Sequence, residues 1–200
     1  MICLELGSGS TTRPSPWITS DLNPQSGAKM VIDVTQRFPF DDNSVDFVYS
    51  EHMIEHLSYL DGLHMLKECY RIMRPGGVCR IVTPSIEFLR DITNSKMESS
   101  FFQSYLQWSF DCFVPGVKYN PDTVRAHVFN GFVRNWGHTF ISAHAPLKDA
   151  MLLAGFEEGI LAWPTPIGFS NHKELCNMES INRLPKGYIE FESMIIEGIK

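Results

Sequence analysis

The sequence holds 200 residues, of which 44% are hydrophobic, and it carries a formal net charge of −6 at pH 7. This length suits one soluble domain, residues 1–200, that buries its core without disulfides or a structural metal. The acidic balance argues against a nucleic-acid partner, because such binding draws on basic surface to displace counterions.

Short apolar and β-branched runs alternate with helix patterns over the first 85 residues. Apolar residues at three- and four-residue steps predict a helix over residues 57–73, which stops at the Pro-Gly-Gly sequence of positions 75–77. Pro14 and Pro16 leave room only for a stub of helix between the first two strands. Strands joined by helical crossovers form a parallel, doubly wound α/β sheet. Its strands are expected over residues 2–6, 17–20, 29–33, 45–49 and 78–82.

Aromatic residues crowd into residues 86–140, which follow the fifth strand. Asn120-Pro121-Asp122 combines a capping side chain, a first-turn proline and an early acid, and so predicts a helix start. We expect two or three helices laid over the carboxyl edge of the sheet. Most of the aromatic side chains should form a satellite core, and together they can build an apolar wall and lid for a substrate.

The rest of the chain predicts one helix and a closing pair of strands. Ser142 is the expected cap of a helix that ends at Gly155. Residues 156–163 and 189–199 are expected to pair as strands, since the second run partly alternates between apolar and polar residues. No repeat, low-complexity tract or linker divides the chain.

The opening sequence MICLELGSGS runs from an apolar strand directly into a turn with glycines at positions 7 and 9. A plain strand-to-helix turn, a nicotinamide dinucleotide site and an S-adenosylmethionine site all use such a turn. The dinucleotide fingerprint requires a further glycine three residues after the second, where this chain has Thr12. Three carboxylates favour the methyl donor: Glu5 can face the methionine ammonium, Asp21 can bind both ribose hydroxyls, and Asp33 lies near the adenine.

Five segments together resemble a class I S-adenosylmethionine-dependent methyltransferase, of the small bacterial type labelled only by its methyltransferase domain. They are LELGSGS, SDLNP, VIDVTQRFPFDDNSVDFVYSEHMIEHL, LKECYRIMRPGGVCRIVTPS and WGHTFISAHAPLKDAMLLAGF, and they cover residues 1–85 and, more loosely, 131–200. The resemblance implies a Rossmann-like sheet of seven strands in the order 3-2-1-4-5-7-6, with the last strand antiparallel. It also implies S-adenosyl-L-methionine as the cofactor. This chain departs from the family at Thr11, which replaces the third glycine of the long form, and in its short first crossover.

The resemblance also assigns cofactor contacts to the ends of the first four strands. Gly7, Ser8 and Gly9 resemble the loop that passes beneath the methionine and ribose. The other implied contacts are Asp21 with Leu22 at the ribose and adenine, Asp33 with Val34 at the adenine edge, and Ser50, Glu51 and His52 at the methionine end.

Methyl transfer is an in-line displacement that needs a base only when the acceptor must lose a proton. His52, directly after the fourth strand, and His138, after the aromatic segment, are the candidate catalytic bases, and a hydrogen-bonded structural role is the alternative for each. The sequence His52-x-x-Glu55-His56 also places three potential ligands on one helical face. It resembles methyltransferases that bind a divalent ion, but those have Glu at the first position. We therefore expect no metal, with Glu55 and His56 in capping and structural roles, and a divalent-metal-assisted methyltransferase is the alternative.

The fourth strand is followed by Ser-Glu-His-Met at 50–53 rather than by the Asn/Asp-Pro-Pro-aromatic run of amide and base-amine methyltransferases. We therefore expect a small-molecule acceptor, such as a sugar, a lipid precursor or a secondary metabolite, methylated at oxygen, nitrogen or carbon. A catalytically idle subunit that binds the cofactor is the alternative from another class, and a homodimer is left open. Five scattered cysteines and the lack of any apolar run near 20 residues predict a cytoplasmic protein without disulfides or a membrane span.

Overall fold

The computed structural model describes residues 1–94, 96–157, 167–179, 184–185 and 187–200. These residues form one sheet in the order β3-β2-β1-β4-β5-β6, in which β6 is antiparallel to β5 and the other neighbours are parallel. The order 3-2-1-4-5 with a final antiparallel strand confirms the predicted fold class. The strands are β1 (Cys3–Leu6), β2 (Trp17–Asp21), β3 (Met30–Val31), β4 (Val45–Glu51), β5 (Met73–Pro84) and β6 (Ser193–Ile199).

The described part of the sheet has six strands where seven were expected. Most of the expected strand over 156–163 lies outside the described residues, although the Glu157 N–H donates to the Ile199 carbonyl at 2.9 Å. The prediction of a strand from residue 189 was wrong at its start, because Tyr188–Glu192 forms the short helix α6. Tyr188 and Phe191 lie on one side of that helix and pack into a cluster of aromatic rings.

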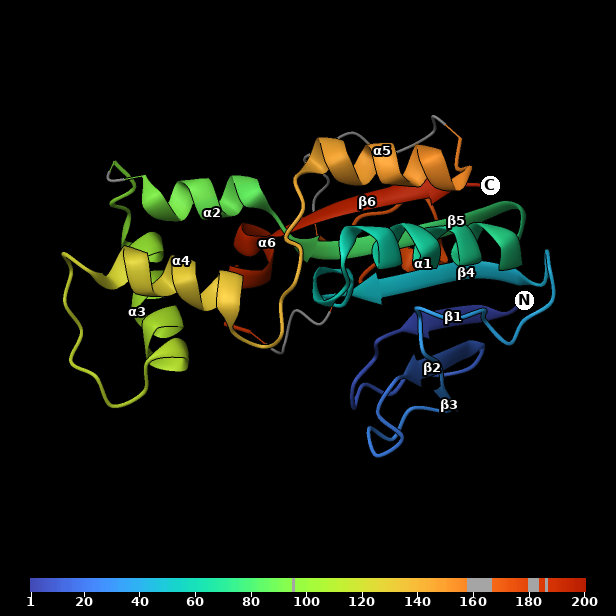
Figure 1. Cartoon of the computed structure of the whole chain (residues 1–200), viewed down its shortest axis with the longest axis horizontal. Coiled ribbons are helices and arrows are strands. Elements are labelled where there is room, and N and C mark those ends of the chain that lie inside the picture. Colours follow the sequence, from blue (N-terminus) through green and yellow to red (C-terminus); the bar gives the residue numbers. More distant parts are fainter. Residues whose placement is uncertain (95, 158–166, 180–183, 186) are drawn as a thin grey trace.

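Two helices cover one face of the sheet, α1 (Tyr59–Ile72) and α5 (His144–Ala154) (Figure 1). The α1 helix begins later than predicted, after the 3-10 helix η1 (Ile54–His56), and the Ser58 hydroxyl accepts the Asp61 N–H at its start. The predicted cap Ser142 was wrong, because α5 begins after Ala143 and the Ser142 hydroxyl donates to the Ala143 carbonyl. The helix ends at Gly155 as predicted, and Gly155 has a φ of 112°.

Residues 167–179 cover the opposite face of the sheet. Within this range, the regular secondary structure is the short 3-10 helix η2 (Lys173–Leu175). Arg80 of β5 is fully buried under this segment and pairs with Glu179 and with Glu197 of β6. Its guanidinium also donates to the Phe169 carbonyl at 3.0 Å. A buried, multiply bonded arginine therefore ties an irregular segment to the sheet, where a doubly wound fold normally has helices.

The aromatic segment forms three helices beyond the carboxyl ends of β4 and β5, namely α2 (Ile86–Thr93), α3 (Ser100–Phe113) and α4 (Val124–Arg134) (Figure 1). They enclose a separate core around Phe88, Phe102 and Phe132, which confirms the expected satellite core. The predicted cap at Asn120 was wrong by three residues, because the N-cap of α4 is Thr123. The Asn120 side chain accepts the Asp122 N–H at 3.0 Å and so stabilises a turn that precedes α4.

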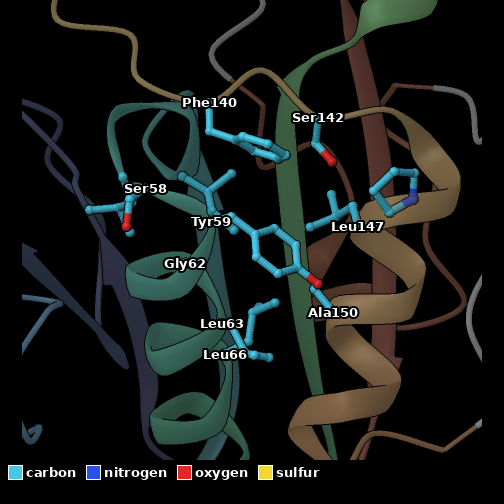
Figure 2. A pocket seen from close by; sticks show the side chains of 12 residues that line it. Ser58, Tyr59, Gly62, Leu63, Leu66, Phe140, Ser142, Leu147 and Ala150 are labelled. Atoms are coloured by element: carbon cyan, nitrogen blue, oxygen red, sulfur yellow. The ribbon is translucent and has the colours of Figure 1, made fainter.

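A cleft between α1 and α5 is too small to be a substrate site. Its volume is about 20 Å³, little more than one water molecule needs. Tyr59 and Phe140 close its mouth with their rings edge to face at 5.5 Å (Figure 2).

All five cysteines are free thiols, and three of them are buried. Among the helices of the described ranges, none combines the length and the apolar character needed to cross a bilayer.

Candidate functional site

The glycine turn after β1 is held in place by the end of β2. The Ser8 N–H donates to the Ser20 carbonyl, and the Gly9 N–H donates to Asp21 Oδ2, both at 2.9 Å. Gly7 and Gly9 have φ of 67° and 55°, in the left-handed region that favours glycine. A Cβ added to Gly7 would overlap the side chain of Met53, so only glycine lets this turn close against the residues after β4.

Asp21 uses both carboxylate oxygens to order the loops around it. Oδ2 accepts the Gly9 N–H, and Oδ1 accepts the Asn23 N–H at 2.8 Å. A carboxylate offers about four acceptor positions, so roughly two are left for a ligand. Leu22 beside it is 65% exposed. The predicted ribose ligand is therefore a loop-ordering residue as well as an available acceptor.

The predicted adenine-edge pair follows β3. The Asp33 carboxylate accepts the backbone N–H and the hydroxyl of Thr35, at 2.9 and 2.7 Å. These bonds favour the charged form and lower the pKa of Asp33. The partly buried Val34 packs against the main core, so its backbone is fixed beside the site.

Glu5 has a partner that the sequence did not predict. Its buried carboxylate is bridged by the Arg13 guanidinium, with Nε to Oε2 at 2.8 Å and Nη2 to Oε1 at 3.1 Å. Arg13 also donates to the Met178 carbonyl and lies over the Tyr49 ring. Burial raises the pKa of Glu5, an effect that Arg13 opposes. A cofactor ammonium at Glu5 would therefore have to compete with Arg13.

The exit of β4 carries the other predicted cofactor contacts. Ser50 is buried, and its hydroxyl has no hydrogen-bond partner within the described part of the chain. Glu51 is buried as well and accepts the Tyr49 hydroxyl at 3.1 Å. The next residue, His52, has φ of 49°, which is uncommon for a residue other than glycine. This left-handed turn redirects the chain from the strand into η1.

His52 lies between two buried carboxylates. Its Nε2 is 2.7 Å from Ser193 Oγ and 3.9 Å from Glu192 Oε1, while its Nδ1 is 3.7 Å from Glu55 Oε1. Glu192 in turn accepts the Tyr105 hydroxyl at 2.6 Å, which links α6 to α3. The imidazole is thus oriented by groups from β6, α6 and η1, and Glu192 connects it to α3 of the aromatic segment.

His138 is turned back toward η1 by its own local chain. Trp136 and Gly137 before it have φ of 57° and 82°, and Nδ1 of His138 is 2.5 Å from the Phe132 carbonyl. Burial, together with nearby His56, lowers the pKa of His138. After the turn, the N–H groups of residues 139 and 140 donate to the Glu55 carbonyl at 2.8 and 3.1 Å. These bonds hold a distant segment of the chain against η1.

A cavity of about 340 Å³ brings the two predicted bases together. Its walls include His52 and His138, together with Glu192 and the rings of Trp108, Phe132 and Trp136. Sequence patterns had not linked Glu192 or Trp108 to this site, because the glutamate lay in a predicted strand and the tryptophan was one aromatic among many.

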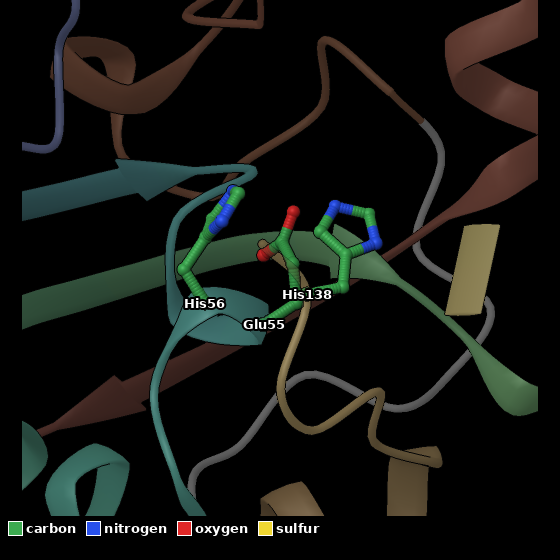
Figure 3. Close-up of side chains that lie close together, drawn as sticks. All are labelled: Glu55, His56 and His138. Atoms are coloured by element: carbon green, nitrogen blue, oxygen red, sulfur yellow. The ribbon is translucent and has the colours of Figure 1, made fainter. Parts of the chain in front are cut away.

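Glu55, His56 and His138 converge at the same cavity. One potential ligand atom from each lies within 4.8 Å of the other two (Figure 3), and the imidazole rings of His56 and His138 contact each other edge to face with centroids 5.0 Å apart. The expected capping role of Glu55 was wrong, because Ser58 caps α1. The buried Glu55 instead accepts the Thr83 hydroxyl at 2.9 Å.

Known proteins resemble part of this sequence. Residues 17–81 match the model of a family described as a methyltransferase domain. A protein of Mycolicibacterium smegmatis, named a probable S-adenosylmethionine-dependent methyltransferase, is 45% identical over 47 residues, which are 24% of this chain. The match spans only 18% of that relative's own length.

Two solved structures share the fold over nearly the whole chain. A complex between the Haloferax volcanii Trm112 methyltransferase activator and a methyltransferase matches with a TM-score of 0.53 at 19% identity, over 99% of this chain and 81% of that one. A SAM-dependent methyltransferase from Thermotoga maritima matches with a TM-score of 0.52 at 18% identity, over 100% of this chain and 82% of that one. At these identities the likeness concerns the fold alone.

Proposed function

Because the chain belongs to the class I S-adenosylmethionine-dependent methyltransferases, we propose that it transfers the methyl group of its cofactor to a small-molecule acceptor. The observation that carries this proposal is the cavity of about 340 Å³ between the end of β4 and the aromatic helices α3 and α4. A volume of this size suits a small organic molecule rather than a folded partner.

The cofactor is assigned to the carboxyl ends of β1, β2 and β4. In open α/β sheets, ligands bind in the crevice outside these ends. The turn at residues 7–9 supplies closely approachable backbone, and Asp21 retains acceptor positions for the ribose hydroxyls. The remaining predicted contacts, from Leu22 to Glu51, lie at the ends of β2, β3 and β4.

The acceptor is assigned to the cavity, with its apolar body against Trp108, Phe132 and Trp136. During transfer, an acceptor oxygen, nitrogen or carbon bonds to the methyl carbon while the sulfur–methyl bond breaks. The proton that the acceptor loses passes to an imidazole of His52 or His138. Nε2 of His138 is the suitable atom there, because its Nδ1 faces the Phe132 carbonyl and donates to it.

The three helices of residues 86–140 are proposed as the lid over this acceptor. Their core is separate from that of the sheet, and they stand beyond the sheet's carboxyl edge (Figure 1), but Tyr188 and Phe191 of α6 belong to the same core, so the proposed lid moves together with α6. A closed lid would favour methyl transfer, because it would exclude water and hold the acceptor in line with the sulfonium.

A cofactor-binding subunit without catalysis is the second candidate. The observation that favours it is the linker between β1 and β2, which forms no helix over residues 10–16 and leaves the cofactor thinly covered there. This second candidate implies a protein partner for the chain. The Haloferax volcanii complex, in which a methyltransferase is bound to a protein activator, is an example of such an assembly with a similar fold.

Transfer of a radiolabelled methyl group to a panel of small hydroxyl, amine and carbon acceptors distinguishes the two candidates. We expect transfer by the wild type, and a higher acceptor KM in Trp136→Ala with unchanged binding of S-adenosylhomocysteine, the demethylated product. Phe169→Ala is the matched control, since its ring is 50% exposed, against 56% for Trp136, and is not among the residues lining the cavity. Binding of S-adenosylhomocysteine without transfer to any acceptor would favour the idle subunit, and no binding at all would refute the cofactor assignment.

A further inference from the structure

The cluster of Glu55, His56 and His138 combines three metal-ligating side chains from two distant parts of the chain (Figure 3). We infer that these three side chains bind a divalent transition-metal cation at the wall of the acceptor cavity. This inference goes beyond the proposed function, because such binding requires neither the cofactor nor the acceptor.

The donor set selects the class of cation. Two imidazole nitrogens and one carboxylate oxygen suit Zn²⁺, Fe²⁺, Co²⁺ or Mn²⁺, whereas Mg²⁺ and Ca²⁺ prefer oxygen ligands throughout. Such nitrogen and oxygen ligands lie about 2.0–2.2 Å from Zn²⁺, so two ligand atoms on one ion are at most about 4.4 Å apart. The three atoms here lie within 4.8 Å, so small rotations of the side chains bring them into range.

Neighbouring groups hold two of the ligands in an orientation that suits a metal. Nδ1 of His138 donates to the Phe132 carbonyl, which leaves the Nε2 lone pair for a cation. Thr83 donates to Glu55 Oε2 and orients that carboxylate. The bonds from residues 139 and 140 to the Glu55 carbonyl fix the distance between the two segments. Outer hydrogen bonds of this kind normally accompany metal ligands, because they set ring orientation and basicity.

The inference departs from the expectation of no metal, and its ligand set differs from the His52-x-x-Glu55-His56 pattern. His52, the first residue of the His52-x-x-Glu55-His56 pattern, has its Nε2 2.7 Å from Ser193 Oγ. His138 takes its place, although it lies 82 positions after His56 in the chain.

The position of the cluster gives the cation an open side. All three residues also line the cavity of about 340 Å³, so coordination positions not filled by protein face the acceptor space. A site with three protein ligands and a free position is typical of catalytic rather than structural metal sites. An acceptor hydroxyl bound there would lose its proton more readily, and His52 would take that proton, because the cation would occupy Nε2 of His138; this consequence rests on the proposed function.

Titration of the chelator-treated, full-length protein with Co²⁺ tests the site without any cofactor. We expect one Co²⁺ per chain, with a visible absorption band that Zn²⁺ abolishes. His56→Ala and His138→Ala should each weaken binding at least about tenfold, and Glu55→Gln, which preserves side-chain shape, should also weaken it. His64→Ala is the matched control, since His64 is exposed on α1 and should leave binding unchanged.

Two outcomes would overturn the inference. One is the absence of Co²⁺ binding by folded wild-type protein, and the other is equal affinity in the wild type and in folded His56→Ala and His138→Ala. Melting curves without metal identify any variant that fails to fold. Binding of S-adenosylhomocysteine, measured in chelator on the same samples, separates the two proposals: if it persists while Co²⁺ does not bind, only the metal inference fails.

Discussion

Replacement of Asp21 tests the link between the glycine turn and the cofactor. The carboxylate accepts N–H groups from Gly9 and Asn23, so Asp21→Ala removes two charge-assisted hydrogen bonds in the free protein and any ribose contact in the complex. A hydrogen bond to a charged group contributes about 1.5–3 kcal/mol. Loss of the ribose contact alone should therefore raise the dissociation constant of S-adenosylhomocysteine roughly 10- to 150-fold, at about 1.4 kcal/mol per decade.

The Asp21→Asn variant should bind S-adenosylhomocysteine nearly as weakly as Asp21→Ala does. An amide has one acceptor oxygen, and its NH₂ group must then face either the Gly9 or the Asn23 N–H without bonding to it. We expect the melting temperature of the free protein to fall in both variants, because the turn loses its anchor. Asp46→Asn is the matched control: Asp46 also accepts a backbone N–H, from Ile2, but near the amino end of β4.

Calorimetric titration with S-adenosylhomocysteine and with its analogue lacking both ribose hydroxyls separates ribose binding from loop order. In the wild type, removal of the ribose hydroxyls from the ligand should raise the dissociation constant by most of the factor expected for Asp21→Ala. In Asp21→Ala, the same removal should change the dissociation constant little. Equal penalties in the two proteins would refute the ribose assignment. Unchanged affinity of both Asp21 variants for the full ligand would refute the role of this carboxylate altogether.

Three further predictions follow from buried or crowded residues. Gly7→Ala should destabilise the protein by about 1–3 kcal/mol through overlap with Met53, and Met53→Ala in the same chain should restore part of the loss in melting temperature; a neutral Gly7→Ala would contradict this. Arg80→Met should cost about 3–5 kcal/mol in urea unfolding, because Glu179 and Glu197 then lose their buried partner. The half-exposed Arg74, replaced in the same way, is the control and should cost under about 1 kcal/mol, and similar losses in both would refute the argument. The Arg71 guanidinium and the Phe38 N–H hold the pKa of Glu68 below its ordinary value, so its stabilisation is present above about pH 4.3 and is lost on acidification. On acidification, the melting temperature should therefore fall less steeply in Glu68→Gln than in the wild type. Equal slopes of melting temperature against pH in the two proteins would contradict this role of Glu68.

Local patterns were enough to predict the parallel half of the sheet. β-branched and apolar runs bounded by turn residues located β1, β2, β4 and the helix α1, because the apolar residues of each element recur with the period of its own secondary structure. The glycine turn could be predicted for a related reason. A left-handed backbone beside a strand end needs glycine, and glycine is visible in the sequence.

Boundaries failed where a distant contact outweighed local preference. Residues 188–192 alternate enough to suggest a strand, yet they form α6, because Tyr188 and Phe191 pack against rings of α2 and α3. The start of α4 was misplaced for a local reason, because the Asn120 side chain accepts the Asp122 N–H and so stabilises a turn before the helix. Arg13 and Glu5 are eight positions apart without helical periodicity, so their pairing could not be anticipated.

The sequence by itself determined the fold class, the alternation of strands and helices and the glycine turn after β1, since these depend on periodicity and on residue type at turns, whereas the strand order came from the family resemblance. Only the tertiary structure decided which histidines and carboxylates share one cavity. His138 reaches Glu55 and His56 through backbone bonds between residues 139–140 and η1, and Glu192 reaches His52 through the pairing of β5 with β6. Such meetings depend on how whole helices and strands dock, and docking is set by the summed packing of many residues rather than by any short motif.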